Sequence, residues 1–260
     1  EAPLVEPNVA FHRVGPRNIP VAILTPKDGL TTTLPVLFDP YGGPHAQRVV
    51  ASNQALAVSQ WFADQGFVVV VADGAGTPGK GSDYEREVAG DLAAPVLSDQ
   101  VHVASVLPEL EPRADMRRVA IRGWSFGGYL AALAVLREPD VFHCGVAGAP
   151  VTDWRLYDTH YTERYLGDPV RERANYERTD LVTDAHLLRR PLLLIHGLAD
   201  DNVVAAHTLQ LSTALLAAGK PHEVLPLSGV THMTPQEVVA ENLLLHQLNF
   251  IRRSLAISQV

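Results

Sequence analysis

The sequence predicts an α/β fold with a mostly parallel sheet covered by helices on both faces. Short apolar runs alternate with helical patterns along the chain. Most of these runs are hydrophobic at every position, which is typical of strands that are buried on both faces of a parallel sheet. Hydrophobic residues make up 47% of the 260 residues, enough for a substantial core, and α/β chains of this size often form one domain.

The order of the apolar runs and helical patterns defines the expected elements. Gly66 and Gly219 stand where a helix should end before the next strand begins. The expected strands cover residues 21–25, 35–39, 67–72, 118–124, 144–149, 191–197 and 222–227. The expected helices cover residues 52–65, 96–110, 127–137, 205–218 and 235–254. Strands that alternate with helices in this way favour an open sheet.

Residues 150–190 interrupt this alternation. They contain no convincing strand, many charges, and the aromatic residues Trp154, Tyr157, Tyr161, Tyr165 and Tyr176. An insertion that follows the carboxyl end of a strand lies where open α/β sheets bind ligands. We therefore expect a small aromatic-rich helical insertion that contributes to a binding site. A purely structural helical cap is the alternative.

Composition excludes several classes of partner. The formal net charge is −8, and the arginine pairs at 117–118, 189–190 and 252–253 are isolated. Nucleic-acid binding requires clustered Lys and Arg, so no nucleic-acid partner is expected. No apolar stretch approaches the roughly 20 residues that span a bilayer, so no membrane partner is expected either. Cys144 is the single cysteine, which excludes an internal disulfide, and with no export signal visible we expect a cytoplasmic location.

A G-x-S-x-G motif lies between an expected strand and an expected helix. It consists of Gly123, Trp124, Ser125, Phe126 and Gly127. In the α/β-hydrolase fold such a serine lies on a tight strand-to-helix turn, and the small residues two positions away prevent clashes. The turn presents the hydroxyl at a helix N-terminus, whose dipole favours developing negative charge. An ordinary glycine-rich turn is the alternative, but the flanking pattern favours Ser125 as the nucleophile of an α/β-hydrolase.

A serine nucleophile requires a histidine base and an orienting carboxylate, in the chain order serine, acid, histidine. His232 lies in a loop after the last expected strand, as the base should. His196 ends a strand, where it can steer a loop, but it precedes the acid. The acid should follow the strand at 191–197; Asp200 and Asp201 both do, and spacing does not choose between them. Such chemistry requires no metal or organic cofactor, and none is expected.

Four segments, taken together, resemble one known family. They are Tyr41-Gly42-Gly43-Pro44, the motif from Gly123 to Tyr129, Tyr161-Thr162-Glu163-Arg164-Tyr165-Leu166-Gly167, and His196-Gly197-Leu198-Ala199-Asp200-Asp201-Asn202-Val203. In this order they resemble the catalytic domain of the prolyl oligopeptidase family of serine peptidases, and its dipeptidyl peptidase IV branch in particular. The resemblance runs from about residue 35 to the end of the chain.

The resemblance implies roles for individual residues. It implies that Asp200 is the acid of the triad and that Asp201 stabilises the loop. It also implies an oxyanion hole formed by the Tyr41 hydroxyl and the backbone N–H of Phe126, and a contact from Asn202 to the backbone carbonyl of the substrate. A compact hydrophobic pocket for proline or another small residue on the acyl side of the cleaved bond is implied for Val151, Trp154, Tyr157, Tyr161 and Val203.

Two departures from the family pattern affect these expectations. In Asp73-Gly74-Ala75-Gly76 the family has arginine where this chain has Ala75, which weakens an ion pair expected to brace a loop near the site. The family usually carries an N-terminal β-propeller, whose acidic residues bind the free amine of the substrate in the dipeptidyl branch, and we recognise no propeller in this sequence. We expect residues 1–29 to be a connecting segment and first strand. Residues 30–260 should be the α/β-hydrolase catalytic domain, either of a longer chain or of a propeller-free relative.

The function implied by the resemblance is a serine peptidase that hydrolyses peptide bonds through an acyl-enzyme, of dipeptidyl or oligopeptidase type. An acylaminoacyl peptidase, or an esterase or lipase of the same fold, stays open because the same triad serves all of these reactions. A non-catalytic interaction module is disfavoured because every triad residue is present. Homo-oligomers are common in such peptidases, and the C-terminal helix is a candidate interface.

Overall fold

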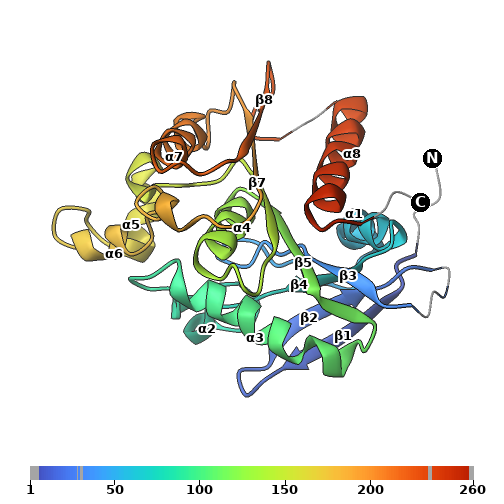
Figure 1. Ribbon diagram of the computed structural model, residues 1–260. Helices are drawn as coiled ribbons and strands as arrows, with labels where there is room; N and C mark the ends of the chain where they lie inside the picture. Colours follow the sequence, from blue (N-terminus) through green and yellow to red (C-terminus); the bar gives the residue numbers. More distant parts are fainter. Residues whose placement is uncertain (1–5, 28, 30–31, 234–235, 258–260) are drawn as a thin grey trace.

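A central sheet organises the computed structural model, which describes residues 6–27, 29, 32–233 and 236–257 (Figure 1). The strands found in these residues are β1 (Val9–Val14), β2 (Ile19–Leu24), β3 (Leu34–Phe38), β4 (Val68–Ala72), β5 (Ala114–Trp124), β6 (Cys144–Gly148), β7 (Leu192–Gly197) and β8 (Glu223–Leu227). They lie in the order β1-β2-β4-β3-β5-β6-β7-β8. The pairs β1–β2 and β2–β4 are antiparallel, and the other neighbours are parallel.

Helices cover both faces of this sheet. The described helices are α1 (Asn53–Asp64), α2 (Ser82–Arg86), α3 (Ala94–Leu110), α4 (Phe126–Arg137), α5 (Thr159–Leu166), α6 (Arg173–Glu177), α7 (Ala206–Ala217) and α8 (Glu237–Ser254), with short 3₁₀ turns η1 (Trp154–Leu156) and η2 (Ala185–Leu187). Helices α1 and α8 pack in one apolar cluster, whereas α3, α4 and α7 pack in another on the opposite face (Figure 1). The predicted α/β class, with a mostly parallel sheet between two helical layers, is confirmed.

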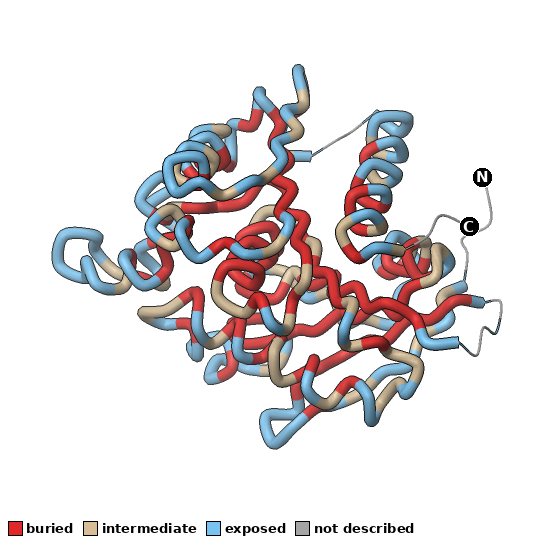
Figure 2. Tube along the Cα trace, viewed as in Figure 1, coloured by how far each residue is buried: buried red, intermediate tan, exposed pale blue. Residues whose placement is uncertain are grey.

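The alternation of side chains along each strand separates these two clusters. In β3, Val36 and Phe38 belong to the cluster with α3 and α4, and Leu37 between them belongs to the cluster with α1 and α8. All three are fully buried, as apolar runs predict for central parallel strands. Figure 2 shows the central strands as continuously buried chain, whereas α6 is mostly exposed and half of the α5 residues are exposed.

The first strand of the sheet differs from expectation. Only the run at 21–25 predicted a strand in this part of the chain, but β1 also forms and pairs with β2 as an edge. Its sequence includes His12 and Arg13, and three of its six residues are exposed and only Val14 is buried, so it lacks the continuous apolar run of a central strand. Helix α2 was also not predicted. The expected start of the last helix, at residue 235, lies outside the described residues.

The carboxyl ends of the parallel strands bring distant parts of the chain together. Tyr41 follows β3, Ser125 follows β5, Asp200 follows β7, and the loop with His232 follows β8. The segment after β6 forms η1, α5, α6 and η2 with no strand among these described residues, as expected for a helical insertion. None of the described helices has the length and apolar character needed to cross a membrane.

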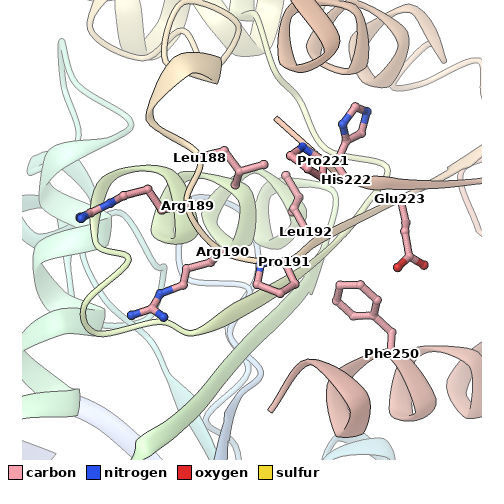
Figure 3. A pocket seen from close by; sticks show the side chains of 9 residues that line it. All are labelled: Leu188, Arg189, Arg190, Pro191, Leu192, Pro221, His222, Glu223 and Phe250. Carbon is pink, nitrogen blue, oxygen red and sulfur yellow. The ribbon is translucent and has the colours of Figure 1, made fainter. Parts of the chain in front are cut away.

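A separate cavity lies at the opposite end of the sheet. It has a volume of about 350 Å³ and lies at the amino ends of β7 and β8, against Phe250 of α8 (Figure 3). Arg189 and Arg190 extend to the other side of the cavity from Phe250 and Glu223 in this view. Because parallel strands run in one direction, this cavity is separated by the length of the sheet from the end that carries Ser125.

Candidate active site

Ser125 occupies a sharp turn between β5 and α4. Its backbone has φ 58° and ψ −119°, a left-handed region that is costly for residues with a side chain. The turn is held by two backbone hydrogen bonds: Ser125 N–H donates to the Gly148 oxygen at 2.9 Å, and the Ser125 oxygen accepts from Tyr129 N–H at 2.9 Å. These bonds tie the turn to β6 and to the first turn of α4.

The two glycines of the motif are required by close backbone approach. A Cβ atom on Gly123 would lie 2.2 Å from the Gly127 oxygen, and one on Gly127 would lie 2.7 Å from the Pro40 oxygen. No side chain fits at either position without moving backbone. The glycines therefore allow β5, α4 and the loop that carries Tyr41 to meet around Ser125.

His232 and Asp200 form a hydrogen-bonded pair. His232 Nδ1 lies 2.7 Å from Asp200 Oδ2. The Asp200 side chain is 0% exposed, and its Oδ1 accepts backbone N–H groups of Asn202 at 3.0 Å and Val203 at 2.9 Å. Asp201 is exposed, so of the two adjacent aspartates it is Asp200 that the structure brings against the imidazole. This arrangement makes Nδ1 of His232 the protonated nitrogen and leaves Nε2 as the acceptor.

A second histidine, His196, supports the loop that carries Asp200. It is buried, its Nε2 lies 2.7 Å from the Val203 oxygen, and its Nδ1 lies 2.7 Å from Thr208 Oγ1. A carbonyl oxygen can only accept, so Nε2 carries the proton and Nδ1 accepts from the hydroxyl. Burial lowers the pKa of His196, which favours the neutral ring. His196 thus closes the loop without adding a second cation beside Asp200.

Tyr41 and Ser125 share a cavity of about 370 Å³. The cavity is lined by Tyr41, His45, Trp124, Ser125, Tyr157, Tyr161, Asn202, His232 and Met233. Burial raises the pKa of Tyr41 to about 12, although hydrogen bonding with Ser125 acts in the opposite direction. The Tyr41 hydroxyl therefore stays protonated at neutral pH and can donate a hydrogen bond.

Aromatic side chains of the insertion form one wall of this cavity. The Trp154 ring stacks on Tyr161 with centroids 5.8 Å apart and planes at 8°, and Tyr157 meets Tyr161 edge-on at 5.4 Å. The Tyr157 hydroxyl donates to Asn202 Oδ1 at 3.1 Å. Because Oδ1 accepts this bond, Asn202 Nδ2 is the group that can donate toward a bound molecule.

The structure places some predicted residues on the cavity surface and others in the apolar core. Tyr41, Ser125, Tyr157, Tyr161, Asn202 and His232 line the cavity. Val151, Trp154 and Val203 are buried in the apolar core and do not line the cavity. Phe126 is also buried, with its ring 5.8 Å from that of Tyr41; its predicted role concerns only its backbone N–H.

Three cavity residues were not predicted: His45, Trp124 and Met233. His45 packs its ring 4.9 Å from Tyr161 and has a left-handed φ of 79°. Trp124 donates its indole N–H to the His232 oxygen at 2.7 Å and so links the nucleophile turn to the histidine loop. Each of the three could have been found from its place in the sequence. Trp124 precedes Ser125, Met233 follows His232, and His45 follows the segment from Tyr41 to Pro44.

The backbone at Ala75 is held by an ion pair to which Ala75 contributes no side chain. Arg17, in the turn between β1 and β2, pairs with the carboxylates of Asp99 and Glu87. The backbone N–H of Ala75 donates to Asp99 Oδ2 at 2.7 Å. The carboxylate of Asp99 therefore binds the Arg17 guanidinium and also accepts a hydrogen bond from the backbone of the loop at Ala75. Among the described residues, no group of three or more His, Cys, Asp or Glu side chains is arranged to hold a metal ion.

Comparison with known proteins places this geometry in a family. The model of the prolyl oligopeptidase family matches residues 53–258. Dipeptidyl peptidase 8 of Homo sapiens is 35% identical over 228 residues, 85% of this chain and 25% of that protein. Prolyl endopeptidase FAP of Homo sapiens is 31% identical over 239 residues, 91% of this chain and 31% of that protein.

A solved structure gives the same answer. The crystal structure of Porphyromonas gingivalis dipeptidyl peptidase 4 superposes with a TM-score of 0.88 at 28% identity, covering 96% of this chain and 36% of that chain. The chain thus spans only 25% to 31% of the length of these two curated relatives. The resemblance that the four sequence segments indicated is confirmed: this chain belongs to the prolyl oligopeptidase family and has its α/β-hydrolase fold.

Proposed function

We propose that this chain is the catalytic part of a serine peptidase, with Ser125 as nucleophile, His232 as base and Asp200 as the orienting acid. The observation that carries the proposal is the 2.7 Å contact between His232 and buried Asp200. His232 lines the same cavity as Ser125, which lies on its strained turn. The membership of the family supports it.

The proposed reaction proceeds through an acyl-enzyme. His232 Nε2 takes the proton of Ser125 as its oxygen attacks a peptide carbonyl, and Asp200 stabilises the imidazolium that forms. His232 then gives this proton to the leaving amine. A water molecule, deprotonated by the same imidazole, then attacks the acyl carbon. The ester bond to Ser125 breaks, the acid product leaves, and His232 returns the proton to the Ser125 oxygen. Every proton in this cycle passes through one ring nitrogen.

Two donors would stabilise the oxyanion. The Tyr41 hydroxyl is protonated at neutral pH because burial raises its pKa to about 12. Phe126 is the first residue of α4, so its N–H has no acceptor within the helix and the helix dipole adds to its effect. Loss of one such donor typically lowers kcat by about 10²- to 10³-fold.

For the substrate we propose a peptide with proline or another small residue on the acyl side of the cleaved bond, cut in a dipeptidyl or oligopeptidase manner. The aromatic wall in which Tyr157 and Tyr161 meet edge-on, with Trp154 stacked on Tyr161, supports this because rigid rings give contact area at little entropic cost. The relatives named dipeptidyl peptidase and prolyl endopeptidase support it too. For the whole protein we propose an N-terminal β-propeller as partner of this domain. Homo-oligomerisation through α8 stays a prediction.

Active-site labelling tests the proposal. A fluorophosphonate probe should label Ser125 in the full-length wild-type protein, and Ser125→Ala should abolish the labelling. Ser228→Ala, at another loop serine, should leave it unchanged. Retained labelling of the Ser125→Ala variant at the same peptide would contradict the assignment. Turnover of a short-chain ester with no detectable turnover of a proline-containing aminoacyl amide would favour an esterase.

A further inference from the structure

A buried ion pair lies on the far side of the sheet from the aromatic wall. Strands β3 and β5 are in parallel register up to Phe38 and Ile121, and Asp39 and Arg122 follow these as the next residues. Arg122 Nη1 lies 2.7 Å from Asp39 Oδ1, so a side-chain contact continues the ladder one step past the last backbone pair. The Asp39 side chain is 2% exposed and the Arg122 side chain is 11% exposed.

The Asp39 carboxylate also closes the loop that carries Tyr41. Its Oδ2 accepts from Arg48 Nη2 at 3.2 Å and from the Ser59 hydroxyl at 2.7 Å. Tyr41 lies between Asp39 and Arg48 in the sequence, so the ion pair between these two residues joins the two ends of the loop that carries Tyr41. One buried side chain therefore holds β5, the far end of the Tyr41 loop and helix α1.

The guanidinium of Arg122 is held as firmly as its partner. Arg122 Nε donates to Gln247 Oε1 of α8 at 3.0 Å, and its planar group lies over the Phe62 ring at 4.7 Å. Burial favours the neutral form of Asp39, but Arg122 and Arg48 outweigh it and hold the pKa of Asp39 below its ordinary value. The pair is thus ionised, and neither charge can leave the other without a large desolvation penalty.

From this geometry we infer that Asp39 and Arg122 are positioning residues that set the separation between the Tyr41 hydroxyl and Ser125. Asp39 precedes Tyr41 by two residues and Arg122 precedes Ser125 by three, so the pair joins the two strands directly beneath the oxyanion donor and the nucleophile. This inference rests on the proposed function. It goes beyond the triad because neither side chain lines the cavity.

The pair should affect the transition state more than substrate binding. The oxyanion exists only after attack, so a small shift of Tyr41 weakens a contact that the bound substrate does not yet make. Displacement of a catalytic group by about 1 Å can cost about 10²-fold in rate. We expect Arg122→Met to lower kcat by about 10- to 100-fold with KM within about twofold, and Arg122→Lys, which keeps the charge, to recover much of the loss.

A double-mutant cycle with Tyr41→Phe tests whether the effect passes through Tyr41. The full-length wild-type protein, Arg122→Met, Tyr41→Phe and the double variant are compared. The two measurements are kcat on a proline-containing aminoacyl amide and the rate of fluorophosphonate labelling. If the pair acts by placing Tyr41, Arg122→Met costs little more once the hydroxyl is absent. Losses that multiply in the double variant, or a single variant with wild-type kcat, overturn the inference.

Control variants separate positioning from stability. Arg137→Met removes another partly buried ion pair, with Asp184, at the end of α4 away from Ser125; it should lower Tm but leave kcat unchanged. Asp39→Asn, which is nearly isosteric, carries the same cycle if Arg122→Met does not fold. A wild-type protein that is not labelled at Ser125 would overturn the proposed function itself, whereas labelled wild type with unaffected variants overturns only the positioning role.

Discussion

At the scale of single residues, adjacent aspartates have different surroundings. Asp200 Oδ1 accepts two backbone N–H groups, which leaves only Oδ2 to face His232, whereas Asp201 is exposed. Spacing could not separate the two, because adjacent residues differ in direction rather than in distance along the chain. The loop's own backbone decides which carboxylate is turned inward.

This geometry predicts the effect of Asp200→Asn. The two N–H groups require an acceptor at the Oδ1 position, so the amide nitrogen must face His232 and donate to Nδ1. The imidazole is then held in the wrong tautomer, and kcat should fall by about 10⁴-fold with a folded protein. Asp201→Asn is the matched control and should change kcat by less than about threefold. Equal losses in the two variants, measured by amide turnover, would contradict the geometry.

The Tyr41 hydroxyl makes a prediction about pH. A phenol donates only while it is protonated, and burial raises the pKa of Tyr41 to about 12. An ordinary tyrosine would lose its proton near about pH 10. The ratio of kcat between wild type and Tyr41→Phe should therefore stay constant from about pH 7 to about pH 10. A ratio that falls toward unity near pH 10 would show that Tyr41 titrates as an exposed phenol.

At the scale of elements, the strand-to-helix turn depends on packing between backbones. Gly123→Ala would place a Cβ 2.2 Å from the Gly127 oxygen, so β5 and α4 must separate. We expect a loss of about 3 kcal/mol or more in the free energy of unfolding, together with loss of labelling at Ser125. Thermal unfolding followed by circular dichroism measures the first effect.

Gly219→Ala serves as the control for that substitution. Gly219 follows the end of α7 and has a φ of 67°, but nothing lies within 4 Å of the added Cβ. The cost should be limited to backbone strain of about 1–2 kcal/mol, and labelling should be unchanged. If the two variants had the same Tm and labelling, the contact with Gly127 would not be the reason for the glycine.

At the scale of the whole molecule, the hydrophobic pattern of the sequence predicts buried strands well but predicts neither edge strands nor the order of strands in the sheet. Apolar runs predicted the central strands because burial on both faces leaves no room for polar residues. The edge strand β1 was missed because half of it faces solvent, and His12 and Arg13 hide its pattern. The pairing of Asp39 with Arg122 required the strand order, in which β3 lies beside β5, and hydrophobic pattern does not specify that order.

Another contact that the hydrophobic pattern could not predict joins the turn between β1 and β2 to helix α3. Arg17 of this turn forms an ion pair with the carboxylate of Asp99. Asp99 of α3 is buried, burial raises its pKa, and its partners include Arg17 and the Ala75 N–H. Arg17→Ala removes the cation but leaves the carboxylate buried. Because the Arg17 side chain is itself 37% exposed, we expect a moderate loss of about 1–2 kcal/mol in the free energy of unfolding at neutral pH.

The sign of the pH dependence makes this prediction specific. Without the cation the pKa of Asp99 rises further, so the penalty appears as pH increases through that raised value and disappears as the carboxyl group protonates at lower pH. The difference in unfolding free energy between wild type and Arg17→Ala, measured by urea titration, should therefore shrink under acid conditions. Adding Asp99→Asn should recover stability at neutral pH. Arg86→Ala, which breaks an exposed pair with Asp83, is the matched control and should show neither effect. A pH-independent loss in Arg17→Ala would mean that the arginine acts by packing on Tyr84 rather than by its charge.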